Sequence, residues 1–401
     1  MNPPTAHVMS YNDITNDNVL SYFPEIINRV NTASHIAIDL EFTALGNTRS
    51  ADMAHRYVAM KQTVESAAIV SIGLSIIKPV EPTEPTEPTT PPIKKYQCDN
   101  FNFLTLKQGS IVIDSNTGTF LCHHGYSFDS MFTKGIPFTP ASPASNVPPR
   151  PLLPTEAKPD TRLNQLWKHI IDIMRFKRIP LVLHNGLFDL MYIYHSFIGQ
   201  LPPNFNMFIL KVSLQFPSGI YDTRYLAEKA DFKATFLKYV FSKSDRLRQN
   251  RAEISTDQRP YFEVNVSPPI LQQNSVSGLK RKRQDEAVNN KDVVDNKIQK
   301  LGYCPKYAER GYCDLGHKES SKYHDMQVIL DHQMGRSKYM SQIPTDDSSH
   351  AAYFDAYMTA FSFCYFLNTL SPLVIKSCLN KMLLSGLNHP LTFPIQNPKK
   401  A

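Results

Sequence analysis

The sequence contains few cysteines and little that would direct it out of a reducing compartment. Six cysteines in 401 residues are too few for a disulfide scaffold, so we expect the thiols to stay reduced. The first thirty residues are polar and carry Pro, Asn and Asp, a composition that does not predict a secretory leader. Beyond a repeated Glu-Pro-Thr triplet there are no long internal repeats.

One uncharged run, residues 356–375, has the length of a membrane span. Polar residues and a proline interrupt it, at Thr359, Ser362, Asn368, Ser371 and Pro372. A buried helix that ends at Ser371 and Pro372 is therefore favoured over a tail anchor, and we expect no membrane partner.

Charge and length give weaker guidance. The net charge is +7 and the pI is about 8.9, a modest surplus that favours an anionic partner without identifying one. Hydrophobic residues make up 42% of the chain, which is enough for a sizeable core. The length suits one large domain with insertions, or two to three domains.

Hydrophobic periodicity predicts a layered α/β domain. Helices are expected at residues 20–30, 53–67, 163–177 and 187–198, with a helix pair beginning at 220–228. Strands are expected at residues 35–42, 67–79, 101–108, 110–115, 118–124 and 180–186.

Composition divides the chain further. Proline-rich loops are predicted at about residues 79–92 and 137–159, because such runs do not pack a core. The character becomes polar from about residue 245, which predicts mobility there. The expected organisation is a main domain at 1–250, a disordered basic linker at 251–300, a small cysteine-bearing finger at 301–330 and the rest of the main domain at 345–401.

Four consecutive basic residues stand inside that linker: Lys280, Arg281, Lys282 and Arg283. They are a candidate nuclear-import signal or an extra phosphate-binding patch, and a solvated charge run is the plain alternative. The first interpretation predicts a nuclear protein.

Two carboxylates stand in the strand predicted at residues 35–42, HIAIDLEF, although strands are depleted in acids. Because strand side chains alternate, Asp39 and Glu41 share one face with Ala37, and the apolar residues share the other. Taken alone, this pattern favours a half-exposed strand with its acids in water. The two carboxylates, roughly 7 Å apart, would also suit a hard cation such as Mg²⁺.

Two further acids and a histidine favour the cation site over the half-exposed strand. Asp189 lies on the first turn of an apolar helix, where the helix dipole alone could account for it. Asp355 stands among aromatic residues, and an acid in such surroundings needs a partner such as a metal. His350 precedes it by five residues, about 140° around a helix. We therefore expect His350 at the helix start, capped by Ser348 or Ser349 and bent over the site.

This series of Asp-x-Glu, Asp and His-x4-Asp resembles the DEDDh class of 3′-to-5′ exonucleases. The segments HIAIDLEFTAL, SFDSMFTKGIPF, PLVLHNGLFDLMYIYHSFIGQLP, PSGIYDTRYLAE and HAAYFDAYMTAF are similar to the CAF-type and PARN-type poly(A)-tail nucleases. The resemblance covers most of the chain apart from the proline-rich loops and residues 245–300. It implies a ribonuclease-H-like fold, a mixed α/β sheet flanked by helices.

The resemblance also implies a mechanism and a substrate. Asp39, Glu41, Asp189 and Asp355 would hold two Mg²⁺ ions, and His350 would take the proton from the attacking water. The substrate would be single-stranded RNA with a free 3′ oligo(A) end, shortened by release of 5′-AMP. Nuclear members of the family suggest nuclear RNAs, including small nuclear RNA precursors, and related dimers leave a homo-oligomer open.

Substrate contacts are predicted near the acids. Phe42 and Leu45 follow the first motif and would wedge against terminal bases, or else pack in the core. Asn185 precedes Asp189 and would orient a ligand, or simply complete its turn.

The segment CPKYAERGYCDLGHKESSKYHD begins like a CCCH zinc finger, with Cys304-x8-Cys313. It then departs, because Glu319 stands where a third cysteine is expected and His324 comes one residue late. His317 is a free soft ligand nearby, so a zinc site made by Cys304, Cys313, His317 and His324 is predicted. The alternative is a short packed loop without metal.

Two other functions use the same residues. An inactive RNA-binding adaptor would have no physical reason to keep four mutually repelling acids. A DNA 3′-to-5′ exonuclease would use the same metal chemistry, and a contact to the 2′-hydroxyl would distinguish it from an RNA enzyme.

Overall fold

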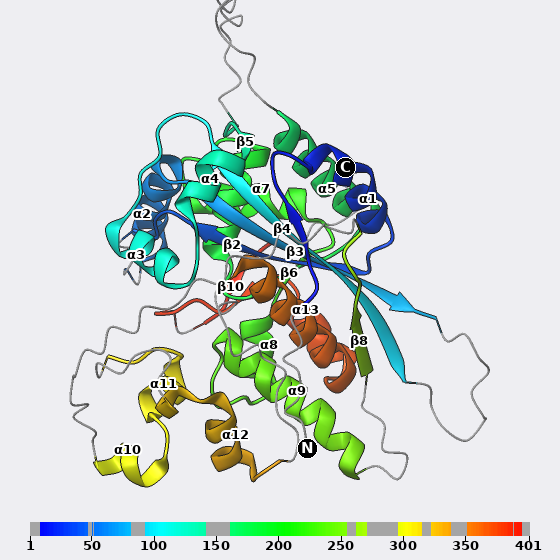
Figure 1. The fold of residues 1–401 in the computed structure, drawn as a ribbon, viewed down its shortest axis with the longest axis vertical. Coiled ribbons are helices and arrows are strands. Elements are labelled where there is room, and N and C mark those ends of the chain that lie inside the picture. The colour runs from blue at the N-terminus through cyan, green and yellow to red at the C-terminus, as the bar shows by residue number, and fades with distance from the viewer. Residues whose placement is uncertain are drawn as a thin grey trace, which may run out of the picture.

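The computed structural model describes residues 9–46, 50, 52–81, 93–141, 161–254, 262–270, 296–314, 322–337, 351–387 and 389–394. Their core is one sheet of order β1-β4-β3-β2-β6-β7-β9-β10, with β5 and β8 also paired to β4 (Figure 1). The strands are β1 (Asn12–Ile14), β2 (His35–Phe42), β3 (Ile69–Val80), β4 (Lys94–Lys107), β5 (Ile136–Phe138), β6 (Leu181–Leu183), β7 (Ile220–Asp222), β8 (Phe262–Val266), β9 (Lys381–Met382) and β10 (Leu391–Thr392).

The sheet is mixed. Strands β2, β3 and β4 run antiparallel to one another, whereas β6 pairs parallel to β2, β7 to β6 and β9 to β7. Three antiparallel strands followed by parallel ones on the side of the first strand form the arrangement of a ribonuclease-H-like fold. The predicted fold class is therefore confirmed.

Helices cover both faces of the sheet. They are α1 (Val19–Asn31), α2 (Met53–Ser66), α3 (Ser115–His123), α4 (Phe128–Lys134), α5 (Arg162–Lys177), α6 (Leu187–Ile193), α7 (Phe205–Gln215), α8 (Thr223–Lys229), α9 (Leu237–Ile254), α10 (Asn296–Leu301), α11 (Pro305–Arg310), α12 (Met326–Met334), α13 (Ala352–Thr369) and α14 (Pro372–Cys378). A π-helical turn, η1 (Tyr194–Ile198), extends α6, and a 3₁₀ turn, η2 (Lys322–His324), precedes α12.

Two hydrophobic clusters identify the faces. Ile36, Ile38 and Leu40 of β2 join the cluster that includes α1, α2, α5, α6 and α7. Ala37 of β2 joins the other cluster, with α8, α9 and α13. In Figure 1, α13 crosses in front of the sheet, with α8 and α9 below it and α10, α11 and α12 at the lower left. The alternation predicted for residues 35–42 is therefore confirmed.

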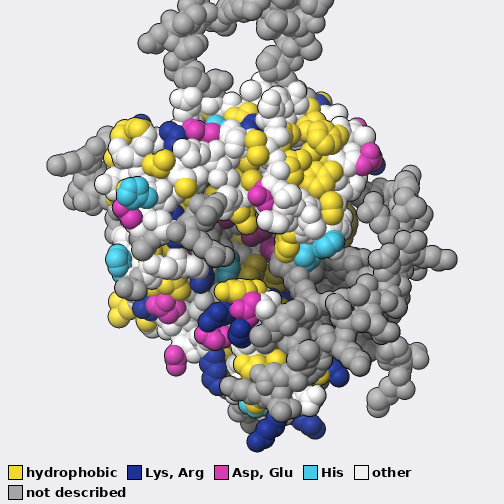
Figure 2. Space-filling view, turned by 90° about the vertical axis from the view of Figure 1, so that its left-hand side faces the viewer, with side chains coloured by type: hydrophobic (Ala, Val, Ile, Leu, Met, Phe, Trp, Pro, Cys, Tyr) yellow, Lys and Arg dark blue, Asp and Glu magenta, His cyan; other side chains and the backbone are white. Residues whose placement is uncertain are grey.

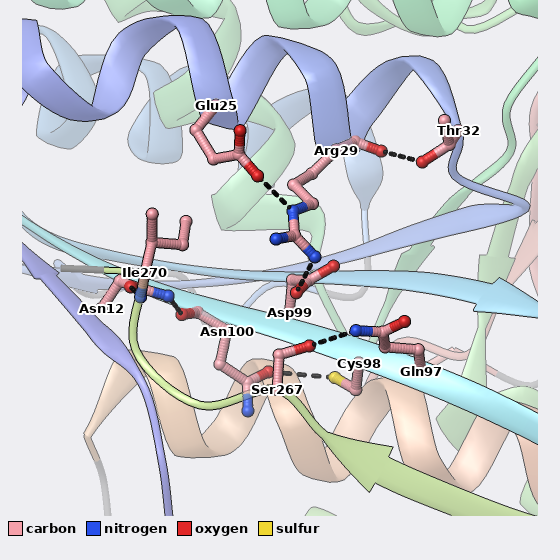
Figure 3. A network of polar contacts seen from close by, with 10 residues as sticks. All are labelled: Asn12, Glu25, Arg29, Thr32, Gln97, Cys98, Asp99, Asn100, Ser267 and Ile270. Carbon is pink, nitrogen blue, oxygen red and sulfur yellow. Dashed lines mark hydrogen bonds and ion pairs between the residues drawn. The ribbon is translucent and has the colours of Figure 1, made fainter. Parts of the chain in front are cut away.

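A polar network fastens the β4 edge of the sheet (Figure 3). Arg29 of α1 forms an ion pair with the buried carboxylate of Asp99 on β4, at 3.0 Å from Nη1 to Oδ1. Asn12 of β1 donates to the carbonyl of Asn100 at 3.1 Å and accepts from the backbone N–H of Ile270 at 2.8 Å. Helix α1, strand β1 and the segment after β8 are thus tied to one strand.

Several sequence predictions differ from the structure. The strand predicted at residues 118–124 is wrong, because Asp114 caps the backbone N–H groups of Asn116 and Thr117 and starts α3. No strand forms at 110–115 either. The mobility predicted from residue 245 onward is also wrong for residues 245–254, which belong to α9.

The predicted linker and membrane alternative can also be compared with the structure. Strand β8 falls inside the linker range 251–300 and differs from the predicted disorder, because it adds to the exposed edge of β4. Residues 271–295 lie outside the described part. The predicted buried helix at 356–375 is α13, which ends at Thr369, and α14 begins at Pro372. None of the described helices is long and apolar enough to cross a membrane.

Candidate active site

Three of the predicted acids meet beside the sheet. One ligand oxygen from each of Asp39, Glu41 and Asp355 lies within 4.8 Å of the others. Asp189 reaches the same place from α6, and its Oδ1 accepts a hydrogen bond from the backbone N–H of Leu40 at 3.1 Å. The structure thus brings together side chains from β2, α6 and α13.

A glycine on the neighbouring strand makes this meeting possible. Gly73 of β3 lies opposite Asp39 in the antiparallel register. A Cβ at Gly73 would collide with the backbone of Ala352 and Tyr353, where α13 begins. The absence of a side chain therefore lets the first turn of α13, with Asp355, lie directly on the sheet. The sequence analysis missed Gly73, although a lone glycine inside an apolar strand is a signal for close backbone approach.

Burial and mutual repulsion perturb the carboxyl groups. Burial, and then the charges of Asp355, Asp189 and Glu41, raise the pKa of Asp39 well above its usual value. Burial and the charges of Asp355 and Asp189 do the same to the pKa of Glu41. Burial raises the pKa of Asp189 to about 7, against hydrogen bonds from the backbone. Such a cluster of oxygen donors would be relieved by a hard divalent cation.

The turn before Asp189 is held by an acid that the sequence analysis did not select. Asp222, at the end of β7, accepts hydrogen bonds from the backbone N–H groups of Asn185 and Leu383, both at 2.8 Å. Asn185 itself is exposed and adopts a positive φ of 57°, a conformation that asparagine tolerates. Arg224 donates to its side-chain oxygen at 3.0 Å. Asn185 therefore points its side chain toward Arg224.

His184 in the same turn is a neutral residue. Burial and the nearby Arg224 charge lower the pKa of His184 to about 3. Its Nδ1 lies 2.9 Å from the hydroxyl of Thr223. His184 is therefore a packing and hydrogen-bonding group of this turn.

The two apolar residues predicted to contact substrate differ in exposure. Phe42 is half-buried and stacks on Tyr192, with ring centroids 4.5 Å apart and planes inclined by 10°. Leu45 is 46% exposed. Packing against Tyr192 thus covers part of the Phe42 side chain, whereas the Leu45 side chain is open to solvent.

Several predicted residues lie outside the described part of the chain. They are the proposed base His350, the finger residue His317 and the basic run Lys280, Arg281, Lys282 and Arg283.

A second cluster contains sulfur and nitrogen donors. Ligand atoms of Cys304, Cys313 and His324 lie within 4.8 Å of one another, and the two Sγ atoms are 3.6 Å apart. The His324 ring stacks on Tyr307 with centroids 4.1 Å apart. We call this part the cysteine module: Cys304 to Asp314 together with η2 and α12.

Comparison with known proteins gives three kinds of match. A family model described as CAF1 family ribonuclease matches residues 14–151 and 154–363. A stretch of 68 residues is 34% identical to the pre-piRNA 3′-exonuclease trimmer of Bombyx mori, and covers 17% of this chain and 13% of that protein. The chain therefore spans about an eighth of the length of that curated relative.

Solved structures show more distant likeness. The RNase domain of the yeast Pop2 protein is 15% identical, with a TM-score of 0.39 over 61% of this chain and 77% of that one. S. pombe Pop2p, in a form with Mg²⁺ and Mn²⁺ bound, is 16% identical, with a TM-score of 0.42 over 60% of this chain and 83% of that one.

The family match extends through both halves of the site. Its first range contains Asp39 and Glu41, and its second contains Asp189 and Asp355. The match covers most of the sequence. The chain belongs to the CAF1 family of ribonucleases.

Proposed function

We propose that this protein is a 3′-to-5′ exoribonuclease that removes oligo(A) or poly(A) tails from RNA. The observation that carries the proposal is the convergence of Asp39, Glu41 and Asp355, with Asp189 fixed beside them. Burying several carboxylates side by side costs folding free energy, because their charges repel one another. A metal-dependent hydrolase explains why they are nevertheless kept together. The preference for adenosine and the 3′ end rest on the sequence motifs.

The donor set suits two Mg²⁺ ions. Asp39, Glu41, Asp189 and Asp355 offer carboxylate oxygens and no soft ligand, which is the chemistry that Mg²⁺ prefers. Such ions, when bound, stabilise the attacking and the leaving oxygen of an in-line displacement at phosphorus.

The chain's own residues have distinct roles in this proposal. The backbone N–H of Leu40 fixes Asp189, and Gly73 lets Asp355 approach Asp39. His350 accepts the proton of the attacking water, since an imidazole titrates near neutral pH. Leu45 contacts the terminal bases, and Phe42 does so from its stacked position on Tyr192.

One assay separates this function from the alternatives. Purified protein is incubated with Mg²⁺ and with oligonucleotides that end in 3′ oligo(A), oligo(U) or DNA. We expect stepwise release of 5′-AMP from the A-tailed RNA, and its loss in Asp39→Asn. Asp172→Asn on α5 is the matched control and should retain activity. Tight RNA binding without any metal-dependent shortening would instead identify an adaptor, and equal shortening of DNA would identify a DNA exonuclease.

We also propose that the cysteine module holds one Zn²⁺. Two thiols and one imidazole already lie within reach of a single ion, and His317 is the proposed fourth ligand. Elemental analysis should find about one zinc per chain, lost in Cys304→Ser and kept in the exposed-cysteine control Cys122→Ser. Zinc binding of unchanged affinity in His317→Ala would contradict the four-ligand set.

Within the family, we propose a nuclear member that resembles the deadenylase called target of early growth response and acts on small nuclear RNA precursors. The basic run at residues 280–283 is the proposed import signal. Replacing its four residues by alanine should move a fluorescent fusion from the nucleus to the cytoplasm. A fusion that stays nuclear would remove this role from the basic run.

A further inference from the structure

A pocket of about 430 Å³ lies between the main domain and the cysteine module. Five separate segments line it: the turn before α6 with Asn185, the start of α8 with Arg224, the residues around the start of α9 with Phe236, the end of α11 with Arg310 and Tyr312 after it, and Ser385 after β9. Its volume falls within the range of ligand pockets, roughly 300–1,000 Å³. None of the four clustered carboxylates Asp39, Glu41, Asp189 and Asp355 lines it, and neither do the predicted zinc ligands.

The pocket lies on the face of the sheet that α13 covers, where the carboxylate cluster also lies. Ala37 of β2 pairs with Val182 of β6 in the parallel register, so Asp39 and His184 come at the same level of the sheet. His184 lines the pocket, and Asp189 follows it by five residues. Two lining residues at the start of α9, Phe236 and Leu237, pack against the hydrophobic cluster that contains α13. A chain leaving the acids across β6 and β7 would therefore meet this pocket.

The cysteine module is fixed to the main domain at the pocket wall. Gly311 ends α11 with a φ of +78°, and a Cβ there would meet the ring of Phe236 at 2.6 Å. The ring of Phe236 also contacts Tyr307 of α11, with centroids 5.8 Å apart. This close approach sets the residues after α11 beside the main domain, so that both parts shape one pocket.

The lining is polar, basic and aromatic. Tyr312 is 61% exposed, and Arg310 close to it in the chain is also exposed. Arg224 is held within the wall by Asn185 and by the hydroxyl of Ser385, at 3.1 Å. Glu309 is the one acid among the described lining residues. On the side of the molecule that carries α2 and α11, Figure 2 shows basic and acidic side chains together below a hollow.

Proteins that bind single-stranded nucleic acid combine aromatic rings, on which bases stack, with positively charged groups that contact the phosphates. We infer that the pocket receives nucleotides of the RNA chain upstream of the 3′ end being cleaved. Tyr312 stacks on a base, and Arg310 contacts a phosphate. This inference rests on the proposed function, because it assigns a path to the RNA that the carboxylates would cut.

The inference is tested by comparing a short and a long substrate. A dinucleotide reaches only the carboxylates, whereas an oligo(A) of about 12 nucleotides is long enough to reach a neighbouring subsite. In Tyr312→Ala and in Arg310→Ala, the ratio of kcat/KM for the long over the short substrate should fall about tenfold. Tyr312→Phe keeps the ring and should restore the ratio.

A binding measurement makes the test independent of hydrolysis. On an Asp39→Asn background, fluorescence anisotropy should show about tenfold weaker binding of the long RNA in Tyr312→Ala. Arg310→Ala should reduce the slope of log K against log salt concentration by about one. The matched controls are Phe176→Ala and Arg175→Ala on α5, an exposed ring and its adjacent guanidinium.

The outcomes are distinct. Unchanged long-RNA binding in both pocket variants, or an equal loss of activity on both substrates, would overturn the inference. Failure of the wild type to cut either substrate would reject the proposed nuclease, while the binding measurement would still decide whether RNA enters the pocket. Both variants alter exposed residues, and matching melting temperatures will confirm that they fold.

Discussion

Gly73 of β3 lies directly against Ala352, the residue with which α13 begins. Gly73 is also the partner of Asp39 in the sheet, so one residue contacts both the strand that carries Asp39 and the helix that carries Asp355. A methyl group there would separate α13 from the strand and draw Asp355 away from Asp39. The geometry of the cluster therefore depends on a residue that has no functional group.

Substitution of this glycine should reduce both activity and stability. In Gly73→Ala we expect a loss of kcat/KM of at least about tenfold, with a destabilisation of roughly 1–3 kcal/mol from overpacking. Hydrolysis of A-tailed RNA and urea unfolding measure the two effects. Gly199→Ala is the control, since its Cβ would meet Tyr194 at an ordinary 3.8 Å. Full activity in Gly73→Ala would show that α13 can shift without cost.

Removing one carboxylate should stabilise the metal-free protein. Burial and neighbouring charges disfavour the ionised form of Asp39, so Asp39→Asn relieves repulsion at pH 8. Thermal melts in EDTA should therefore show a higher melting temperature for the variant than for the wild type. The same variant should lose the stabilisation that Mg²⁺ gives the wild type. A lower melting temperature in EDTA would mean that Asp39 has a structural role.

Stability of the metal-free protein should depend on pH through Asp189. The fold raises the pKa of Asp189 from 3.8 to about 7, because the neutral carboxyl group is favoured in the folded state. Its contribution to stability is complete below pH 3.8 and is lost as pH rises through about 7. The melting temperature in EDTA should therefore fall as the pH rises from 3.8 to about 7, and level off above that.

Added Mg²⁺ should reverse that fall, since the metal needs deprotonated ligands and competes with protons. The rise in melting temperature caused by Mg²⁺ should be larger at pH 8 than at pH 6. Asp189→Asn removes the titrating group and should flatten the pH dependence in EDTA. An equal Mg²⁺ effect at both pH values would exclude a proton-linked site.

The ion pair at the β4 edge should contribute to stability. Arg29 bonds both Asp99, whose side chain is 5% exposed, and Glu25. Arg29→Ala leaves the Asp99 carboxylate buried without its charge partner, and we expect a cost of roughly 1–3 kcal/mol in urea unfolding. The double variant Arg29→Ala/Asp99→Asn should recover part of this loss. Glu25→Gln removes the more exposed of the two carboxylates bound to Arg29 and should cost less than about 1 kcal/mol.

The sequence predicted the site through local patterns and failed where tertiary contacts decide. The two-residue period of HIAIDLEF placed Asp39 and Glu41 on one face, and the structure confirms that alternation. Gly73 carried a local signal of close backbone approach, but nothing local identified Asp39 as its strand partner or α13 as the approaching helix, since strand register depends on the whole sheet. Strand β8 was missed for a related reason: five residues in a polar stretch become a strand because β4 offers them an edge.

The separation of Asp39 from Asp355 along the chain has a consequence for synthesis. The two residues are 316 positions apart (355 − 39), and α13 is among the last helices to be made. A nascent chain that has reached residue 340 contains the residues of β2 and α6 but not those of α13, so it lacks one member of the acidic cluster. A product truncated before α13 would therefore lack both Asp355 and the helix that forms much of the second hydrophobic cluster.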